Sequence, residues 1–165
     1  MPWSALLVLG GAMVAAAWHI DTTAALLPDT VATHFAGDGQ PNGWMTRDGY
    51  RVFMIVFVTV LPLFFVAVTG WLPRLLPGSV GIPNRQYWMA PQRREQALRF
   101  LTAHACWLGC LLVLFILGVH VLLLQANRSV PVRLSESGMF GLLGAFALAL
   151  LAWIVILVRR FRRVD

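Results

Sequence analysis

The stretch LPDTVATHFAGDGQPNGW, residues 27–44, is a polar segment between two apolar runs that are each long enough to cross a membrane. It is rich in Gly, Pro and Asp, and it carries one histidine, His34. Within it, VATHF at residues 31–35 alternates and is β-prone, and the turn-forming sequences AGDG and PNG follow. We expect an ordered loop with some strand structure that connects two membrane spans.

The composition of the chain indicates that lipid is its solvent. Of its 165 residues, 59% are hydrophobic and 12% are charged, whereas a soluble domain usually carries about 25% charged residues. All 13 basic residues are arginine, and the lack of lysine excludes a phosphate-binding P-loop and Schiff-base chemistry. Because the arginines alternate with long apolar runs, we expect no nucleic-acid surface.

Four apolar stretches have the length of about 20 residues that a helix needs to cross a bilayer, and none contains a charged residue. Only helices satisfy their own backbone at this length. The predicted fold class is therefore all-α: a polytopic membrane protein, a four-transmembrane-helix bundle with a small extracytoplasmic cap. The single membrane domain, residues 1–165, has predicted spans at about 3–20, 52–72, 100–124 and 139–158, outer loops at 21–51 and 125–138, and an inner loop at 73–99.

The arginines predict which way these spans face. With four spans, the loop between spans two and three shares a side with the C-terminal tail, and these two regions hold nine arginines against four on the other side. The positive-inside rule therefore predicts a multi-pass protein with both termini in the cytoplasm. Arg85, Arg93 and Arg94 belong to the predicted basic face, which would meet the lipid bilayer or a partner.

Two local predictions concern the outer face. SVPVRL, residues 129–134, is an extended piece of the second outer loop, and we expect it to pair with residues 31–35 as a two-stranded cap. Thr46 is expected to cap the second span, and Ser135 or Ser137 the fourth.

Three of the four histidines are expected at the outer boundary of the membrane: His19, His34 and His120. Histidines at membrane depth are uncommon and are candidate site residues. They could bind Zn or Cu, or His19 and His120 could hold a heme. Polar support would come from Asp21, Gln125 and Asn127. The alternative is that each histidine makes an ordinary hydrogen bond or lies at the headgroup level, and no HExxH or CxxCH motif favours the metal.

The segment 27–44 resembles the signature of the SdpI-like bacterial membrane proteins, a family with a domain of unknown function. That signature consists of Leu-Pro, a Val, a His followed by an aromatic residue, a Gly, and a Gly-Trp end just before a second span. The residues at these places are Leu27, Pro28, Val31, His34, Phe35, Gly39, Gly43 and Trp44.

The resemblance covers about residues 5–72 and implies a protein of the bacterial cytoplasmic (inner) membrane. It also implies that the loop carries the binding residues: Pro28, His34, Phe35, Gly39, Gly43 and Trp44. The roles that it implies are immunity to a secreted peptide, signalling, or an accessory subunit.

The sequence leaves two main classes of function open. The favoured one is a non-enzymatic binding protein whose extracytoplasmic loop meets a peptide, a lipid or a protein partner, as a homo-oligomer or a subunit of a larger membrane complex. The alternative is a metal- or heme-binding membrane protein or enzyme with an outer-face histidine site. A transporter is disfavoured because the spans lack carboxylates and arginines. No GxSxG motif or phosphate loop supports hydrolase or ATPase chemistry.

Overall fold

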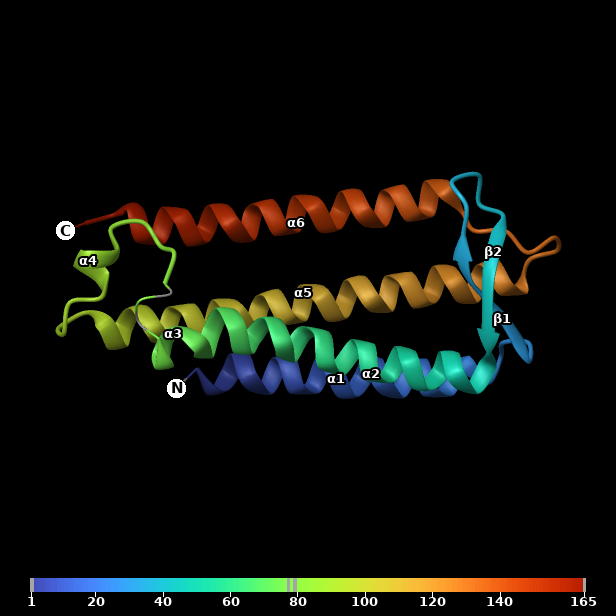
Figure 1. Ribbon diagram of the computed structural model, residues 1–165, viewed down its shortest axis with the longest axis horizontal. Helices are drawn as coiled ribbons and strands as arrows, with labels where there is room; N and C mark the ends of the chain where they lie inside the picture. The colour runs from blue at the N-terminus through green and yellow to red at the C-terminus, as the bar shows by residue number, and fades with distance from the viewer. Residues whose placement is uncertain (1, 77, 79, 165) are drawn as a thin grey trace.

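The computed structural model describes residues 2–76, 78 and 80–164. This part of the chain is mostly helical, with four long apolar helices and one two-stranded hairpin (Figure 1). The long helices are α1 (Trp3–Ala24), α2 (Arg47–Val66), α5 (Arg94–Arg128) and α6 (Glu136–Arg162). The helix α2 continues through the π-helix η1 (Ala67–Trp71) into α3 (Leu72–Leu75), and α4 (Arg85–Trp88) is a short helix in the following loop. The hairpin consists of β1 (Thr30–Phe35) and β2 (Pro41–Thr46).

The four helical segments that can cross a membrane are 22, 29, 35 and 27 residues long, counted over the described residues. They confirm the predicted fold class. Each helix is longer than the predicted apolar span, because the helix continues through polar and charged residues such as Arg47 and Arg128. At the membrane surface, water and lipid headgroups can solvate such charged side chains, and the backbone hydrogen bonds of the helix continue past them.

The helices α1, α2 and α5 pack together, while α6 runs along α5 (Figure 1). The beginning of α1 and the end of α6 lie at one end of the bundle, here called the terminal end, and the hairpin lies at the other, here called the hairpin end. The main core lies among α1, α2 and α5, with Ile20, Val58 and Val113 fully or nearly fully buried. Phe161 is the single buried residue among those described in α6.

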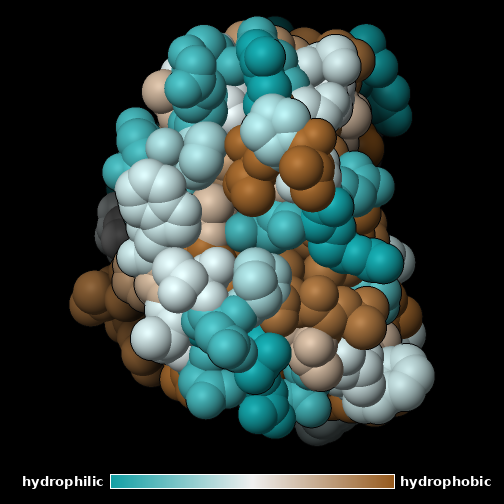
Figure 2. Space-filling view, turned by 90° about the vertical axis from the view of Figure 1, so that its right-hand side faces the viewer, coloured by the Kyte–Doolittle hydropathy of each residue, from teal (hydrophilic) through white to brown (hydrophobic). Residues whose placement is uncertain are grey.

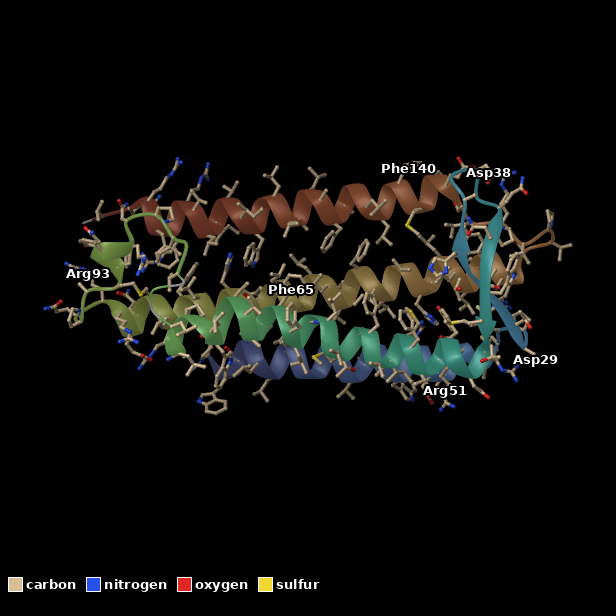
Figure 3. All side chains as sticks on the ribbon, viewed as in Figure 1. Asp29, Asp38, Arg51, Phe65, Arg93 and Phe140 are labelled. Carbon is tan, nitrogen blue, oxygen red and sulfur yellow. The ribbon has the colours of Figure 1, made fainter. Side chains whose placement is uncertain are left out.

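Polar side chains are concentrated at the two ends of the bundle. Figure 3 places Asp29, Asp38 and Arg51 at the hairpin end and Arg93 at the terminal end, with Phe65 along the stretch between them. The outward faces of this middle stretch are apolar. Such a distribution matches a bilayer, in which hydrocarbon covers the middle of the helices and the headgroups meet their ends.

The hairpin pairs β1 with β2 in antiparallel register, with Val31 opposite Met45 and Ala32 opposite Trp44. The prediction that residues 31–35 pair with 129–134 was therefore wrong. Residues 36–40 form a tight local connection, in which the backbone N–H of Ala36 donates to Gln40 O at 2.8 Å. A short local connection costs less closure entropy than a partner about 100 residues away. Residues 129–134 instead form an irregular loop against the hairpin tip.

The predicted helix caps are largely confirmed. The side chain of Thr46 accepts a hydrogen bond from the backbone N–H of Gly49 at 3.2 Å and caps α2. For α6, the choice between two serines is resolved in favour of Ser135, which accepts from the backbone N–H of Gly138 at 3.1 Å. These caps set where the two helices begin beneath the hairpin.

A groove beneath the hairpin as the candidate functional site

The hairpin is attached to α5 by one buried side-chain amide. Asn127 accepts from the backbone N–H of Ala32 at 2.8 Å through Oδ1, and it donates to Ala32 O at 2.9 Å through Nδ2. The same Nδ2 also donates to Leu123 O at 2.9 Å. The amide therefore takes the place of a neighbouring strand on the open edge of β1. Asn127, predicted as polar support for a site, positions the hairpin.

The hairpin tip is held by the loop that precedes α6. The backbone N–H of Leu134 donates to Gly39 O at 3.0 Å, and Arg133 Nη2 donates to Asp38 O at 2.8 Å. Gly39 has φ +78°, and a Cβ at this position would lie 2.7 Å from Leu134 O. Glycine is required here for both its left-handed conformation and its small size.

His34 lies on the exposed surface of β1, across from Gly43 on β2. A Cβ on Gly43 would lie 3.0 Å from His34 Cβ and 3.2 Å from its Nδ1, so the absence of a side chain there makes room for the imidazole. Nδ1 lies 3.3 Å from the hydroxyl of Thr33. Within the described residues, Nε2 has no hydrogen-bond partner, which leaves it available to a ligand.

Two adjacent apolar cavities lie beneath His34. One, of about 370 Å³, lies toward α2, and the other, of about 320 Å³, lies toward α6. Their shared wall is formed by Thr33, His34, Val119 and Leu123, and we call the two cavities together the hairpin groove. Figure 2 looks onto this end of the molecule and shows apolar surface exposed between hydrophilic side chains.

The walls of the hairpin groove are aromatic and rich in methionine. The α2-side cavity is lined by Met45, Met54, Phe53, Phe57 and Phe115, together with the ring of Tyr50. The α6-side cavity is lined by Met139, Phe140 and Phe35, with Glu136 as its charged residue. A concave apolar surface with a few polar groups is typical of binding sites for small or extended ligands.

Directly behind the groove, the imidazole of His120 is completely buried and is hydrogen-bonded at both ring nitrogens. Nε2 lies 2.7 Å from the hydroxyl of Thr23, and Nδ1 lies 2.7 Å from the hydroxyl of Tyr50. The ring of His19 contacts His120 edge-on, with 6.0 Å between the ring centroids. This cluster joins α1, α2 and α5 just below the hairpin.

The donor and the acceptor of each hydrogen bond in this cluster can be assigned. The Thr23 hydroxyl donates its only proton to His19 O at 2.6 Å, so it can only accept from His120. Nε2 of His120 must therefore carry the proton, and Nδ1 must accept from the hydroxyl of Tyr50. The side chains of Thr23, His120 and Tyr50 are all hydrogen-bonded, and they form a polar connection between α1, α5 and α2.

Sequence reasoning did not identify Tyr50 and Thr23 as members of this cluster. A weak signal exists for Thr23, because it lies four residues after His19 and so on the same helix face. For Tyr50 there is no such signal, since its role depends on how closely α2 approaches α5.

The structure separates the three histidines that were considered as metal ligands. His19 and His120 are neighbours, whereas His34 lies on the exposed surface of the hairpin. Among the described residues, no group of three or more His, Cys, Asp or Glu side chains could hold a metal ion. Asp21 forms an ion pair with Arg51, and Gln125 is exposed.

The other residues of the loop signature shape the hairpin. Pro28 is exposed in the turn that precedes β1, and Phe35 is half-buried against the main core. The side chain of Trp44 is 57% exposed on β2, where it can reach the headgroup region.

The predicted basic face lies at the terminal end. Arg93 covers the ring of Tyr87, with 4.0 Å from its Cζ to the ring centroid, and Arg94 Nη2 donates to Arg74 O at 3.4 Å. Arg85 begins the short helix α4.

Four membrane-length helices and a hairpin over an apolar groove define a small multi-span membrane protein. Residues 5–60 match the family described as Domain of unknown function (DUF1648). This match covers about a third of the chain, from α1 through the hairpin into α2. Neither the curated proteins nor the solved structures gave a match.

Proposed function

We propose that this chain is a non-enzymatic binding protein of SdpI-like type, which holds an amphipathic peptide in the hairpin groove. The observation that carries the proposal is the position of His34, whose imidazole belongs to the walls of both cavities. The apolar walls would bury the hydrophobic side chains of the peptide, and His34 Nε2 would bond to its backbone or to a polar side chain.

Two properties of the groove favour a peptide over a compact small molecule. The two cavities lie side by side beneath one strand, so the combined surface is elongated. Its methionine and phenylalanine side chains form a surface that can adapt to different apolar partners. The resemblance to a family with roles in peptide immunity and signalling agrees with this choice of ligand.

We also propose that the protein lies in the bacterial inner membrane with the hairpin on the outer side. The support is the imbalance of arginines, nine at the terminal end and four at the hairpin end. A reporter that is active only in the periplasm, fused after residue 46 and separately after residue 164, tests this orientation. Activity of the second fusion alone would contradict it.

The binding proposal can be tested with a dye-labelled synthetic amphipathic peptide and protein in nanodiscs, with empty nanodiscs as the blank. Fluorescence anisotropy should show saturable binding. His34→Ala should weaken the binding roughly two- to twelvefold, because one hydrogen bond contributes about 0.5 to 1.5 kcal/mol. The matched control is Gln40→Ala, an exposed residue of the same hairpin outside both cavities.

A second variant tests the walls of the groove. Phe57→Ala removes an aromatic side chain from the α2-side cavity and should weaken binding, while far-UV circular dichroism confirms that the helices are intact. Equal binding by the wild type, His34→Ala and Phe57→Ala would refute the assignment of the groove. Binding no greater than to empty nanodiscs would refute the peptide as ligand.

The metal- or heme-binding alternative stays a prediction. Metal analysis and an optical spectrum of the purified protein decide it, since a stoichiometric metal or a Soret band that His120→Leu removes would support it. In that case the hydroxyl partners of His120 would have to give way to the metal.

A further inference from the structure

A separate cavity, of about 290 Å³, lies near the terminal end, and we call it the terminal cavity. It is lined by η1 and α3, by α5, by α6, and by the loop at residues 80–82. Its walls are formed by Val68, Thr69, Leu72, Pro73, Val80, Gly81, Ile82, Leu101, His104, Trp153 and Leu157. It is distinct from the hairpin groove, with which it shares no residue.

The polar side chains of the terminal cavity are already occupied with one another or with backbone. The hydroxyl of Thr69 donates to Phe65 O at 2.7 Å. His104 Nε2 bonds to Trp153 O at 3.0 Å, and Trp153 Nε1 donates to His104 O at 2.9 Å. The two rings are stacked with their centroids 4.4 Å apart.

The remaining wall is apolar, so the cavity offers contacts suited to hydrocarbon. An engineered apolar cavity of roughly 150 Å³ stays dry and binds apolar molecules, and this cavity is about twice that size. In a protein whose helices are surrounded by lipid, the hydrocarbon closest at hand is an acyl chain.

Arginines lie close to this cavity on two elements. Arg160 follows Leu157 by three residues and so shares its helix face, just beyond the cavity. Its guanidinium covers the ring of Trp88 at 4.3 Å from the centroid, and within the described residues its N–H groups donate no hydrogen bond. On α5, Arg94 lies two turns before Leu101 on the same helix face, where it donates to Arg74 O at 3.4 Å.

The terminal end as a whole has an excess of positive charge. Nine arginines lie here: Arg74, Arg85, Arg93, Arg94, Arg99, Arg159, Arg160, Arg162 and Arg163. Among the described residues of this end, Glu95 is the single carboxylate, and both Arg74 and Arg99 pair with it. Among the described residues, the other arginines of this end form no ion pair with a carboxylate, so an external anion can bind to them.

We propose that the terminal cavity takes one acyl chain of an anionic phospholipid, with the lipid phosphate bound by the arginines at its edge, Arg160 foremost. The apolar cavity and the unneutralised charge lie next to each other, and an anionic phospholipid satisfies both with one molecule. The site neither depends on the peptide nor requires a particular orientation of the chain.

The test uses the full chain in nanodiscs that contain phosphatidylglycerol or phosphatidylcholine. The protein is then released from the nanodiscs, and native mass spectrometry counts the lipid molecules that stay bound to it. Phosphatidylglycerol should be retained in preference to phosphatidylcholine. Arg160→Gln should weaken its retention roughly fivefold, because one basic residue near an anionic membrane surface contributes about 1 kcal/mol. The matched control is Arg128→Gln, at the hairpin end.

The acyl chain is tested by filling the cavity. Leu157→Trp adds bulk to its wall and should lower retention of the lipid, whereas Leu148→Trp, on a 70% exposed position of the same helix, should not. If Leu157→Trp disrupts the fold, competition decides: phosphatidylglycerol with short chains should be retained less than the long-chain lipid.

Three outcomes would overturn the proposal. The first is equal retention of the two lipids, and the second is unchanged retention by Arg160→Gln. The third is displacement of the lipid by inorganic phosphate at equal concentration, which would show an anion site with no contribution from the chain.

Discussion

The substitution Tyr50→Phe tests the hydrogen-bonded cluster around His120 most directly. It removes one oxygen and keeps the aromatic ring, whose centroid lies 5.8 Å from that of His120. Nδ1 of His120 then loses its only donor, at a side chain that has no exposure to solvent. A buried acceptor left without a partner costs about 1 to 3 kcal/mol, so we expect a loss of about 2 kcal/mol in the free energy of unfolding.

A double-mutant cycle isolates the interaction itself. His120→Leu alone leaves the Tyr50 hydroxyl without its acceptor, whereas Tyr50→Phe combined with His120→Leu removes both groups together. Because replacing both partners by apolar groups avoids the orphaned atom, the double variant should be more stable than the sum of the singles predicts, by about 1 to 2 kcal/mol.

The assay is reversible unfolding in mixed micelles by titration with SDS, followed by far-UV circular dichroism. Thr22 and Thr23 provide the matched pair of controls. Thr23→Val breaks the bond to His120 and should destabilise, while Thr22→Val removes a hydroxyl that bonds only to backbone near the surface, with an expected effect within about 0.5 kcal/mol. Strictly additive single and double variants would show that the cluster does not couple the helices.

Three further predictions concern the hairpin and its supports. Asn127→Ala leaves the backbone of Ala32 unpaired, so hydrogen exchange should accelerate across β1 while the helices keep their protection. Gly43→Val places a branched side chain within about 3 Å of the His34 ring and should displace that ring, seen as changed imidazole NMR shifts, with a loss of about 1 to 3 kcal/mol. Ser135→Ala removes the N-terminal cap of α6 and should lower the free energy of unfolding by about 1 kcal/mol, measured in the same SDS titration.

The membrane helices could be predicted because the thickness of the bilayer alone sets the length of the apolar run that each helix needs. A bilayer requires about 20 apolar residues, and each of the four stretches stands out on that basis alone. The starts of α2 and α6 were predicted from their caps, Thr46 and Ser135, whereas the apolar pattern alone did not locate the ends of α5. The helix α5 begins at Arg94 and ends at Arg128, several residues outside the predicted span on both sides. Charged residues can extend a helix into the headgroup region, where hydropathy carries no information about backbone conformation.

The hairpin was only half predicted, and the reason lies in its second strand. Residues 31–35 have the alternation of a strand, whereas PNG at residues 41–43 carries the residues of a turn. In the structure, Pro41 begins β2 and Gly43 is retained within it, opposite His34. The requirement for space around the imidazole outweighs the usual weakness of glycine in a strand. That requirement depends on a cross-strand contact, which a local pattern does not contain.

The candidate site also depends on contacts between segments, which a local sequence pattern does not contain. His34 and its loop stand out in the sequence, but the cavities beneath it are made by side chains from α2, α5 and α6. Tyr50 and Thr23 are ordinary residues of their helices until the packing brings them within hydrogen-bonding distance of His120. Distances of this kind follow from the assembled bundle rather than from any one segment.

The amide that completes the edge of β1 has a consequence for biogenesis. Asn127 comes 95 residues after Ala32 in the chain. At a translation rate of about 5 to 20 residues per second, the ribosome needs roughly 5 to 19 seconds to deliver it. During most of that interval the hairpin edge lacks its amide partner and the Tyr50 hydroxyl lacks the imidazole of His120, so the outer end of the bundle acquires these contacts only after the second half of the chain has been made.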